Sequence, residues 1–414
     1  MKNIIKIPLC KLQKKQLSII EELSFHTSKL YNIANYSNRN DKFSNYYEMC
    51  KLYKENYHTL FLHSQSSQQC LKVLEQNWKS FFASNKDYRS NPHKYEGEPN
   101  PPKFKNHKNK KNEIIFTKAG IRIKNDLLLL SLSKKMKDIF KVQSLNFRIN
   151  MSKMPFNISN IQQIHIQWNN SSKIWEMIVI YNREEVNITT GNNIMSIDLG
   201  LDNLATCTFK DNSDCYIING KTIKSKNSYF NKEIAKLTSI KMKQDGNPKY
   251  FKRSKKIIKL QKKRNDYIND YMHKASRKTI NLALDNNCNT IVIGDFSGVK
   301  QGNQAKSFVQ IPQQRMVEMI KYKAKLIGID VIMQKESYTS GCSAIDEEEV
   351  SKKYYNKSRR IERGLFVSND GIKINADQNG SINILRKYLK CSPKYLKDMR
   401  DNGYVANPLR ITIE

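Results

Sequence analysis

Three carboxylates stand where a strand or a helix would present them at one edge of a sheet. Asp198 ends the apolar run IMSID, and Gly200 after it allows a tight turn. Glu336 follows the run GIDVIMQK, and Asp377 lies in NADQNGSINI. Carboxylate oxygens suit Mg²⁺, and two ions held by three carboxylates can activate a water and stabilise the leaving oxygen of a phosphodiester. Asp198 and Asp377 together indicate a candidate metal site for phosphodiester hydrolysis, and the role of Glu336 depends on the order of the strands in the sheet.

Each carboxylate also has a simpler interpretation. Asp198 fits a turn residue after a strand, Asp377 fits a helix N-cap, and Glu336 fits an exposed charge near a loop. For either aspartate alone, the simpler interpretation is at least as good as catalysis. The metal site is favoured because these residues occur together in a strongly basic chain.

The charge of the chain predicts a polyanionic partner. Its 414 residues include 72 Lys or Arg and 38 Asp or Glu, which gives a formal net charge of +34. A surplus of this size is most easily understood if nucleic acid neutralises it, with an anionic membrane surface as the second candidate. No apolar run has the length of a membrane-spanning helix, and the first residues do not resemble a signal peptide. We therefore expect a soluble, intracellular protein with no membrane partner.

The elements that must position the carboxylates lie in the second half of the chain. An apolar pattern predicts three strands, a long basic helical region, and then a strand, helix, strand and helix in turn. This order is that of an RNase H-like fold. The predicted elements, in the same order, cover residues 194–199, 204–209, 214–219, 229–286, 290–295, 313–327 and 329–334, with a helix from about 378.

The first half reads as a different domain. Short β segments and the hairpin 161–181 predict a small β-barrel over 1–185, with a helical insertion at about 12–112. Helices are expected at 12–36 and 66–83, with Trp78 packed in the core. The segment 86–112 is rich in Pro, Asn and Lys, and we expect an exposed basic loop there. The polar stretch 186–193 marks the domain boundary.

One segment concentrates the positive charge. Residues 249–278 contain twelve Lys or Arg and two Asp, which favours phosphate contacts over a merely solvated helix face. The positions that we expect to contact nucleic acid in the basic loop and in this segment are Lys103, Lys105, Lys252, Arg253, Lys255, Lys256, Lys259, Lys262, Lys263, Arg264 and Arg277.

Five motifs in one order give a more specific indication. SIDLGLDNLAT, the basic stretch ending HKASRK, IVIGDFSGVK, YTSGCS and NADQNGSINI cover roughly residues 194–388. In order and spacing they resemble the TnpB family of transposon-encoded, RNA-guided DNA nucleases, relatives of type V CRISPR effectors and Fanzor proteins. Each motif alone is weak, but the five together are a strong signal.

The resemblance implies a complete set of properties. The fold would be a multidomain α+β protein with an N-terminal barrel and helical recognition lobe, followed by an RNase H-like (RuvC) nuclease domain at 194–414. Asp198, Glu336 and Asp377 would be catalytic and would hold Mg²⁺, or Mn²⁺ in its place. The partners would be a transposon-derived guide RNA and double-stranded DNA with a short flanking motif, and a monomer is favoured. The protein would act in the cytoplasm or nucleoid of a bacterium, or in a eukaryotic nucleus.

Two departures from the family pattern matter. Typical members carry two CxxC pairs that form a zinc ribbon in the insertion before the last aspartate, whereas residues 337–374 contain only Cys342. We therefore expect no structural zinc in this target-strand-loading insertion. Arg359, Arg360 and Arg363 are expected to supply electrostatic support in its place, or to contact phosphate.

The second departure concerns the catalytic glutamate. Family members usually read IVIED where this chain reads IVIGD, so Gly294 stands at the glutamate position. Strand alternation points Asp295 to the other face of the sheet. The resemblance implies a strand order of 3-2-1-4-5, which puts the fifth strand one place beyond the fourth. Glu336 after that fifth strand would then reach a metal held by Asp198 and supply the missing ligand.

Two other functions remain open at this stage. A nuclease-dead relative would use the same RNA-guided binding to repress transcription, and loss of the usual glutamate would support it. A compact type V CRISPR effector would differ in genomic context more than in chemistry.

Overall fold

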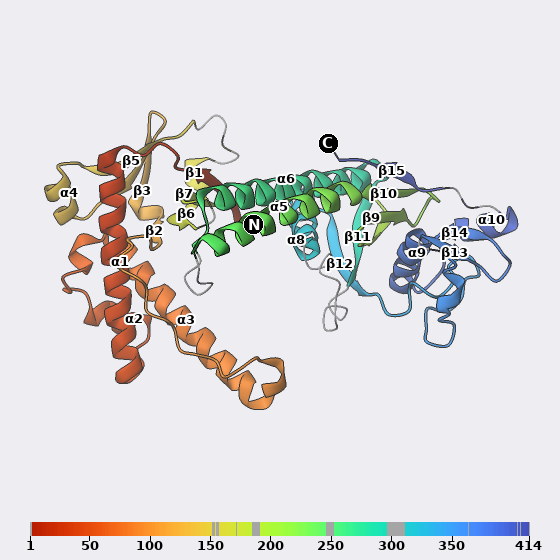
Figure 1. Cartoon of the computed structure of the whole chain (residues 1–414), viewed down its shortest axis with the longest axis horizontal. Helices are drawn as coiled ribbons and strands as arrows, with labels where there is room; N and C mark the ends of the chain where they lie inside the picture. The colour runs from red at the N-terminus through yellow and green to blue at the C-terminus, as the bar shows by residue number, and fades with distance from the viewer. Residues whose placement is uncertain are drawn as a thin grey trace. The chain divides into compact units, whose positions relative to one another are not determined.

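The computed structural model describes residues 2–150, 154, 157–170, 172–183, 191–245, 252–295, 311–362, 364–403, 405 and 407–413. The chain divides into two compact units, Met1–Glu184 and Glu185–Glu414, whose elements are labelled in Figure 1. This division lies beside the expected boundary at 186–193, of which 186–190 fall outside the described residues. Within the described ranges, the helices are too short or too polar to cross a membrane.

The strands of the first unit form two antiparallel sheets. One sheet has the order β1-β7-β6-β2, from β1 (Lys2–Pro8), β7 (Ile174–Asn182), β6 (Ile161–Asn169) and β2 (Ile114–Thr117). The other has the order β3-β4-β5, from β3 (Ile121–Lys124), β4 (Leu127–Ser131) and β5 (Ser144–Arg148). Strand pairing among the described residues gives two open sheets and does not close them into the expected barrel.

Helices lie between the strands of this unit in sequence. They are α1 (Lys14–Asn40), α2 (Tyr46–Leu52), α3 (Ser64–Ser90) and α4 (Lys134–Phe140). Trp78 of α3 is buried, and its indole donates a hydrogen bond to Asn35 Oδ1 of α1 at 3.0 Å. The predicted core position of Trp78 is therefore confirmed, and the bond satisfies its polar atom.

The segment after α3 differs from the expected loop. The helix α3 itself continues to Ser90, and the following chain is bound along α1. Asn32 donates to the Lys105 carbonyl and accepts from the Lys105 amide, both at 2.8 Å, while Asn35 donates to the Pro102 carbonyl at 2.8 Å. The prediction of an exposed basic loop over 86–112 is wrong for 86–90, which are helical, whereas none of residues 91–112 is buried, although helix side chains bind part of their backbone.

The second unit is built on one mixed sheet. Its order is β12-β11-β8-β9-β10-β15. Counted along the chain from β8, the first five strands follow the expected 3-2-1-4-5 order, which is confirmed. The strands are β8 (Asn193–Asp198), β9 (Asn203–Phe209), β10 (Cys215–Asn219), β11 (Cys288–Asp295), β12 (Asp330–Lys335) and β15 (Leu409–Ile411).

The sheet has helices on both faces (Figure 1). The helices α6 (Lys255–Asp285) and α8 (Gln313–Lys325) pack together against β11 and β12, and α9 (Ala376–Leu389) lies across β8 and β9 on the other face. Small polar residues make the α9 contact: Ser381 Oγ lies 3.2 Å from Ser196 Oγ and 2.9 Å from Thr208 Oγ1. These contacts hold α9 against β8 and β9.

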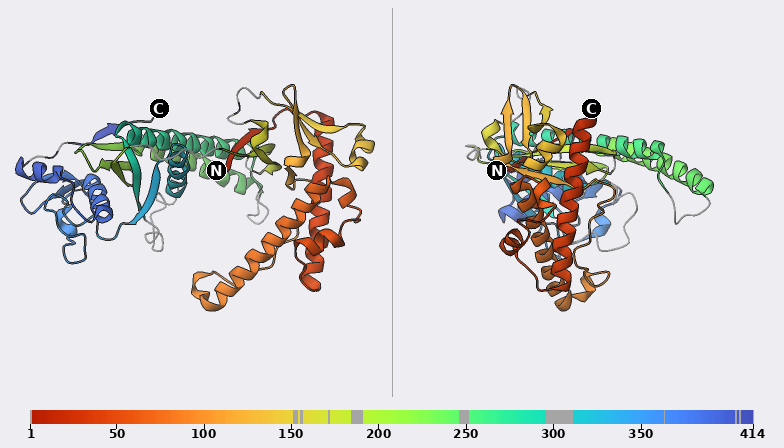
Figure 2. Two further views of the ribbon diagram at one scale, coloured as in Figure 1. Left: turned by 180° about the vertical axis from the view of Figure 1, so that it is seen from behind. Right: turned by 90° about the vertical axis from the view of Figure 1, so that its left-hand side faces the viewer.

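The basic region is two helices and not one. The helix α5 (Lys221–Asp245) begins before the expected residue 229, and α6 ends at Asp285. The two helices pack along each other, as Figures 1 and 2 show. Ile257, Ile268 and Tyr271 of α6 are buried, whereas most lysines of α6 stay exposed.

The remaining elements follow β12. They are the short hairpin of β13 (Leu365–Val367) and β14 (Lys373–Asn375), and the helix α10 (Tyr395–Asp401). Leu396 of α10 and Phe366 of β13 share a small core with Ile382 of α9. The hairpin thus leads directly into the start of α9.

Candidate active site

Asp198, Glu336 and Asp377 line one cavity of the second unit. Its volume is about 590 Å³. Asp198 is the last residue of β8, Glu336 follows β12, and Asp377 is in the first turn of α9. The structure therefore brings together the three carboxylates that the sequence singled out. The cavity is also lined by Leu199, Gly200, Asn203, Thr206, Asp295, Lys335, Ser337, Thr339, Ser340 and Arg360.

Asp198 lies directly below the helix α9. A Cβ atom added at Gly380 would come within 2.7 Å of Asp198 Oδ2, so a glycine there lets the helix approach the carboxyl. Burial raises the pKa of Asp198 well above its usual value, and the charges of Glu336 and Asp377 add to the effect. Arg360 and the Leu199 amide act in the opposite direction. The carboxyl is therefore placed where a cation would relieve its repulsion.

Glu336 occupies the space that Gly294 leaves open. A Cβ atom at position 294 would lie 2.0 Å from Glu336 Oε1 and 2.8 Å from its Cδ. Burial, with a further contribution from Asp295, raises the pKa of Glu336 to about 7. Its Oε1 is buried and has no hydrogen-bond partner. Such an oxygen is costly to leave unpaired, which marks it as a binding atom.

Asp295 differs from its predicted position. Strand alternation was expected to turn it to the opposite face, yet it lines the same cavity, and its charge raises the pKa of Glu336. Asp295 is the last residue of β11, so its direction is no longer fixed by a continuing strand. The site thus contains a fourth carboxylate.

Asp377 is not the N-cap of α9. That role belongs to Asn375, whose side chain accepts from the Asp377 amide at 3.0 Å and from the Gln378 amide at 3.2 Å. The Asp377 carboxylate accepts instead from Asn203 Nδ2 at 2.5 Å and forms an ion pair with Arg360 at 3.1 Å. Its side chain therefore belongs to the cavity and not to the helix end.

The three arginines of the insertion have separate places. The guanidinium of Arg360 reaches Asp377, as given above. Arg359 is bound to Glu348 at 2.8 Å and lies 3.9 Å from Asp346, with 17% of its side chain exposed. The guanidinium of Arg359 therefore binds acidic residues of the insertion itself. Arg363 lies outside the described residues.

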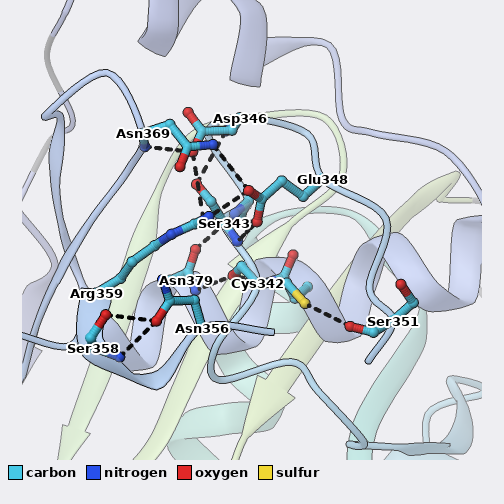
Figure 3. A network of polar contacts seen from close by, with 12 residues as sticks. Cys342, Ser343, Asp346, Glu348, Ser351, Asn356, Ser358, Arg359, Asn369 and Asn379 are labelled. Carbon is cyan, nitrogen blue, oxygen red and sulfur yellow. Dashed lines mark hydrogen bonds and ion pairs between the residues drawn. The ribbon is translucent and has the colours of Figure 1, made fainter. Parts of the chain in front are cut away.

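A network of polar contacts holds the insertion at 337–374, which lacks the two CxxC pairs of typical family members (Figure 3). The Cys342 thiol donates to the Ser351 carbonyl at 3.4 Å. Glu348 accepts from the Ser343 amide at 2.8 Å as well as from Arg359. From α9, Asn379 donates to the Cys342 carbonyl at 2.9 Å and accepts from the Ala344 amide at 2.8 Å. Side chains of the helix thus fix the insertion beside the cavity.

Most of the predicted nucleic-acid contacts are exposed side chains. Lys103 of the first unit is exposed, whereas the Lys105 ammonium lies 4.4 Å from the Tyr31 ring centre. In the second unit, Arg264 is half-buried, and its Nε donates to Asn227 Oδ1 of α5 at 2.7 Å. The other positions of α6 and its preceding residues are exposed: Lys252, Arg253, Lys255, Lys256, Lys259, Lys262, Lys263 and Arg277.

The donor set of the cavity fits a hard divalent cation. Carboxylate oxygens predominate, one of them is buried without a partner, and burial, together with repulsion from Glu336 and Asp377, raises the pKa of Asp198. Across the described part of the chain, no three His, Cys, Asp or Glu side chains already converge closely enough to hold one ion. The carboxylates therefore line the cavity from three elements and would have to close on an ion.

Sequence reasoning missed several residues of the site. Asn203 opens β9 next to Asp377, and Thr206 faces Asp198 in the register of β8 and β9. The Thr206 side chain is buried and its Oγ1 has no hydrogen-bond partner. Both lie on the strand that follows the SIDLG motif, so the strand pairing would have been the signal. The ion pair between Arg360 and Asp377 could not be predicted, because it depends on how the insertion at 337–374 folds.

Comparisons with known proteins agree with this architecture. Residues 177–300 match the OrfB_IS605 family, described as "Probable transposase", and residues 314–384 match the Cas12f1-like TNB domain. The chain is 23% identical over 413 residues to the TnpB-like protein ORF457 of Acidianus two-tailed virus, covering 93% of this chain and 86% of that protein.

Two solved structures share the fold. The first is a Cas12f1–sgRNA–target DNA complex, with a TM-score of 0.57, 15% identity, and coverage of 90% of this chain and 83% of that chain. The second is the mini-RNA-guided endonuclease CRISPR-Cas_phi3, with a TM-score of 0.52, 11% identity, and coverage of 93% and 92%. The fold is thus a multidomain α+β fold resembling that of type V effectors.

Proposed function

This chain belongs to the TnpB family, and from that premise we propose that it is an RNA-guided DNA endonuclease. The observation that carries the proposal is the cavity that Asp198, Glu336 and Asp377 line from three separate elements. The second unit would be the RNase H-like, or RuvC, nuclease domain. Residues 337–374 would be its target-strand-loading insertion, and the first unit would be the recognition lobe.

Mg²⁺, or Mn²⁺ in its place, would supply the activated water and the stabilisation of the leaving oxygen. Asp198, Glu336 and Asp377 would hold it. Asn203 and Arg360 orient the Asp377 carboxylate by binding one oxygen each. Gly294 leaves the room in which the Glu336 carboxyl sits, and Asp295 adds negative charge beside it.

The basic surfaces would bind the nucleic acids. The exposed lysines of α6 would contact phosphates of a guide RNA or of the guide–target duplex, and Lys103 would do so in the first unit. Base pairing between guide and target would select the sequence, while the protein would read a short flanking DNA motif. The guide would be transcribed from the transposon end, and the active form would be a monomer.

A nuclease-dead repressor is the alternative outcome. It would retain RNA-guided binding and lack cleavage. Glu336 argues for cleavage, because its carboxyl fills the cavity beside Asp198 where position 294 offers none.

Plasmid cleavage separates the two functions. The purified protein, with the RNA that copurifies with it, is incubated with Mg²⁺ and a plasmid that carries the matching target. We expect cleavage by the wild type and none by Asp198→Ala, with equal target binding by both. If the wild type binds its target and never cuts, the endonuclease proposal fails. If Glu336→Ala cuts normally, Glu336 is not the third ligand.

A further inference from the structure

A second, smaller cleft adjoins the cavity of the carboxylates. Its volume is about 270 Å³, room for a phosphate group with several waters at about 30 Å³ each. Gly200, Asn203, Arg360 and Asp377 line both spaces. The walls that belong to the smaller cleft alone are Leu201, Asp202, Lys221, Gly364, Asn375 and Arg410. The two spaces are therefore adjacent and share part of their walls.

The charge of the smaller cleft is opposite to that of the cavity. Lys221, Arg360 and Arg410 contribute cations to it, and Asp198, Asp295 and Glu336 do not line it. Its two carboxylates are already neutralised: Asp202 by Lys224 at 2.7 Å and Asp377 by Arg360 at 3.1 Å. The side chains of Lys221 and Arg410 are exposed. The cleft thus attracts an anion, whereas the cavity attracts a cation.

Two helix N-termini add to the positive electrostatic potential of the smaller cleft. The helix α5 begins at Lys221, and α9 begins at Ala376, next to Asn375 of the cleft. The N-terminus of a helix carries partial positive charge and favours anions. Lys221, Arg410 and two helix ends therefore surround one small space, in addition to the Arg360 that is paired with Asp377, and this arrangement is more than a lysine-rich surface.

Arg410 is coupled to the catalytic carboxylate through one amide. Its Nη1 donates to Asn203 Oδ1 at 3.0 Å, and Asn203 Nδ2 donates to Asp377 Oδ2 at 2.5 Å. Arg410 comes from β15, which pairs in parallel with β10 at the edge of the sheet. The strand β15 thereby brings a cation to the cleft from a distant part of the sequence.

We propose that this cleft binds a phosphate of the DNA strand that is cut, next to the scissile phosphodiester. Lys221 and Arg410 would contact that phosphate directly, and Asn203 would transmit its position to Asp377. The inference rests on the proposed function, because it places the strand relative to the same carboxylates. Its role is to set the register of the strand in the cavity.

A neutral phosphate tests the contact directly. A methylphosphonate, which lacks the negative charge, is placed in turn at each position near the cut site of the target strand. We expect one position to slow single-turnover cleavage by the wild type by roughly tenfold, as loss of one charged hydrogen bond predicts. Arg410→Gln and Lys221→Gln should each slow cleavage of the unmodified strand similarly. At the sensitive position, the modification should add no further loss in these variants.

Lys210→Gln is the matched control. Lys210 follows the last residue of β9, whereas Asn203 is the first residue of that strand, and the substitution should leave the rate unchanged. If Arg410→Gln and Lys221→Gln cut at the wild-type rate, or if their losses multiply with the modification at every position, the cleft does not bind the strand.

A second measurement does not depend on cleavage. The rate at which an amine-reactive reagent labels Lys221 is measured by mass spectrometry, with and without a short single-stranded DNA oligonucleotide. We expect the oligonucleotide to slow labelling of Lys221 several-fold in the wild type, less in Arg410→Gln, and not at Lys210. Equal labelling of Lys221 with and without DNA overturns the inference. If DNA slows the labelling of Lys221 but the plasmid remains uncut, the cleft binds DNA as proposed and the endonuclease proposal fails.

Discussion

At the scale of single residues, the pair Gly294 and Glu336 decides whether Glu336 can join Asp198 and Asp377 as the third proposed metal ligand. Gly294→Ala adds a Cβ atom that would lie only 2.0 Å from the present position of Glu336 Oε1, so the two atoms would clash. The displaced atom is the end of a flexible side chain, so the protein should stay folded while Glu336 leaves the cavity. We expect an unchanged melting temperature and a cleavage rate lower by roughly a hundredfold.

The control uses the background without the glutamate. In Glu336→Ala, adding Gly294→Ala should change the rate no further, because there is no carboxyl left to displace. The exchange Gly294→Glu with Glu336→Gly should recover part of the activity. A rate in Gly294→Ala equal to that of the wild type would show that Glu336 does not act from its present position.

Because His26 is buried and its pKa is lowered, we predict that the stability of the first unit depends on pH. The His26 side chain is 2% exposed, with Nδ1 at 2.8 Å from His58 Nδ1 and the ring stacked on Phe61. Burial lowers its pKa to about 4, although Glu22 acts in the opposite direction. The unfolded chain binds this proton near pH 6.5, so stability is complete above that pH and falls as the pH drops toward 4.

The loss has an upper bound of about 3 kcal/mol, which screening by solvent reduces. Urea unfolding at pH 7 and pH 4.5 measures it. We expect His26→Gln to be less sensitive to pH than the wild type, and His93→Gln, at an exposed position, to behave like the wild type. Equal pH dependence in all three proteins would remove His26 as the cause.

At the scale of elements, the insertion at 337–374 depends on polar contacts. Glu348 accepts from Arg359, from the Ser343 amide and from Asn369 Nδ2 at 3.1 Å. Glu348→Gln removes the charge that these donors share, and we expect the free energy of unfolding to fall by about 1–3 kcal/mol. Glu349→Gln, at the exposed neighbour, should change it by less than about 0.5 kcal/mol.

The same segment should tolerate a chelator. Because side chains from α9 and Glu348 hold it, we expect EDTA to leave the melting temperature of the protein unchanged, as judged by circular dichroism. Stoichiometric zinc in tag-free protein, lost together with stability on chelation, would contradict this.

Elements with regular apolar patterns were predictable from the sequence. The run from β8 to α9 follows the expected order, because buried strands and an amphipathic helix leave clear periodicities. The chain after α3 was not predictable, since Asn32 and Asn35 bind its backbone from a helix far away in sequence. The strand β15 has only Leu409–Ile411, too short a pattern to read.

The candidate site divides in the same way. Asp198, Glu336 and Asp377 were found because each stands at the end of a readable element. Asn203, Arg360 and the direction of Asp295 depend on contacts between elements, which one sequence does not contain. The N-cap of α9 shows the same limit, since either Asn375 or Asp377 could have capped the helix and the structure shows that Asn375 does.

At the scale of the whole molecule, the net charge of +34 should make binding to nucleic acid strongly dependent on salt. Replacing Lys259, Lys262 and Lys263 of α6 with Gln would remove three of the proposed phosphate contacts. The slope of log K against log salt concentration should then become less negative by roughly 2 to 3, since each contact contributes about 0.7 to 0.9.

A matched triple variant tests whether position matters or charge alone. Lys390, Lys394 and Lys397 near α10 are equally exposed, and their replacement by Gln changes the net charge by the same amount. Filter binding of the copurified RNA at several salt concentrations gives both slopes. If the two variants shift the slope equally, α6 is not a specific binding surface.

The contact between Glu336 and the space at Gly294 also constrains how such a chain changes over generations. A glutamate at 294 collides with Glu336 in its present place, and loss of Glu336 alone leaves the cavity one carboxylate short. We therefore expect each single substitution to lower activity and the exchange of both to recover part of it. Lineages with either arrangement should thus persist side by side, and sequences that carry Gly at the first position should carry an acid at the second.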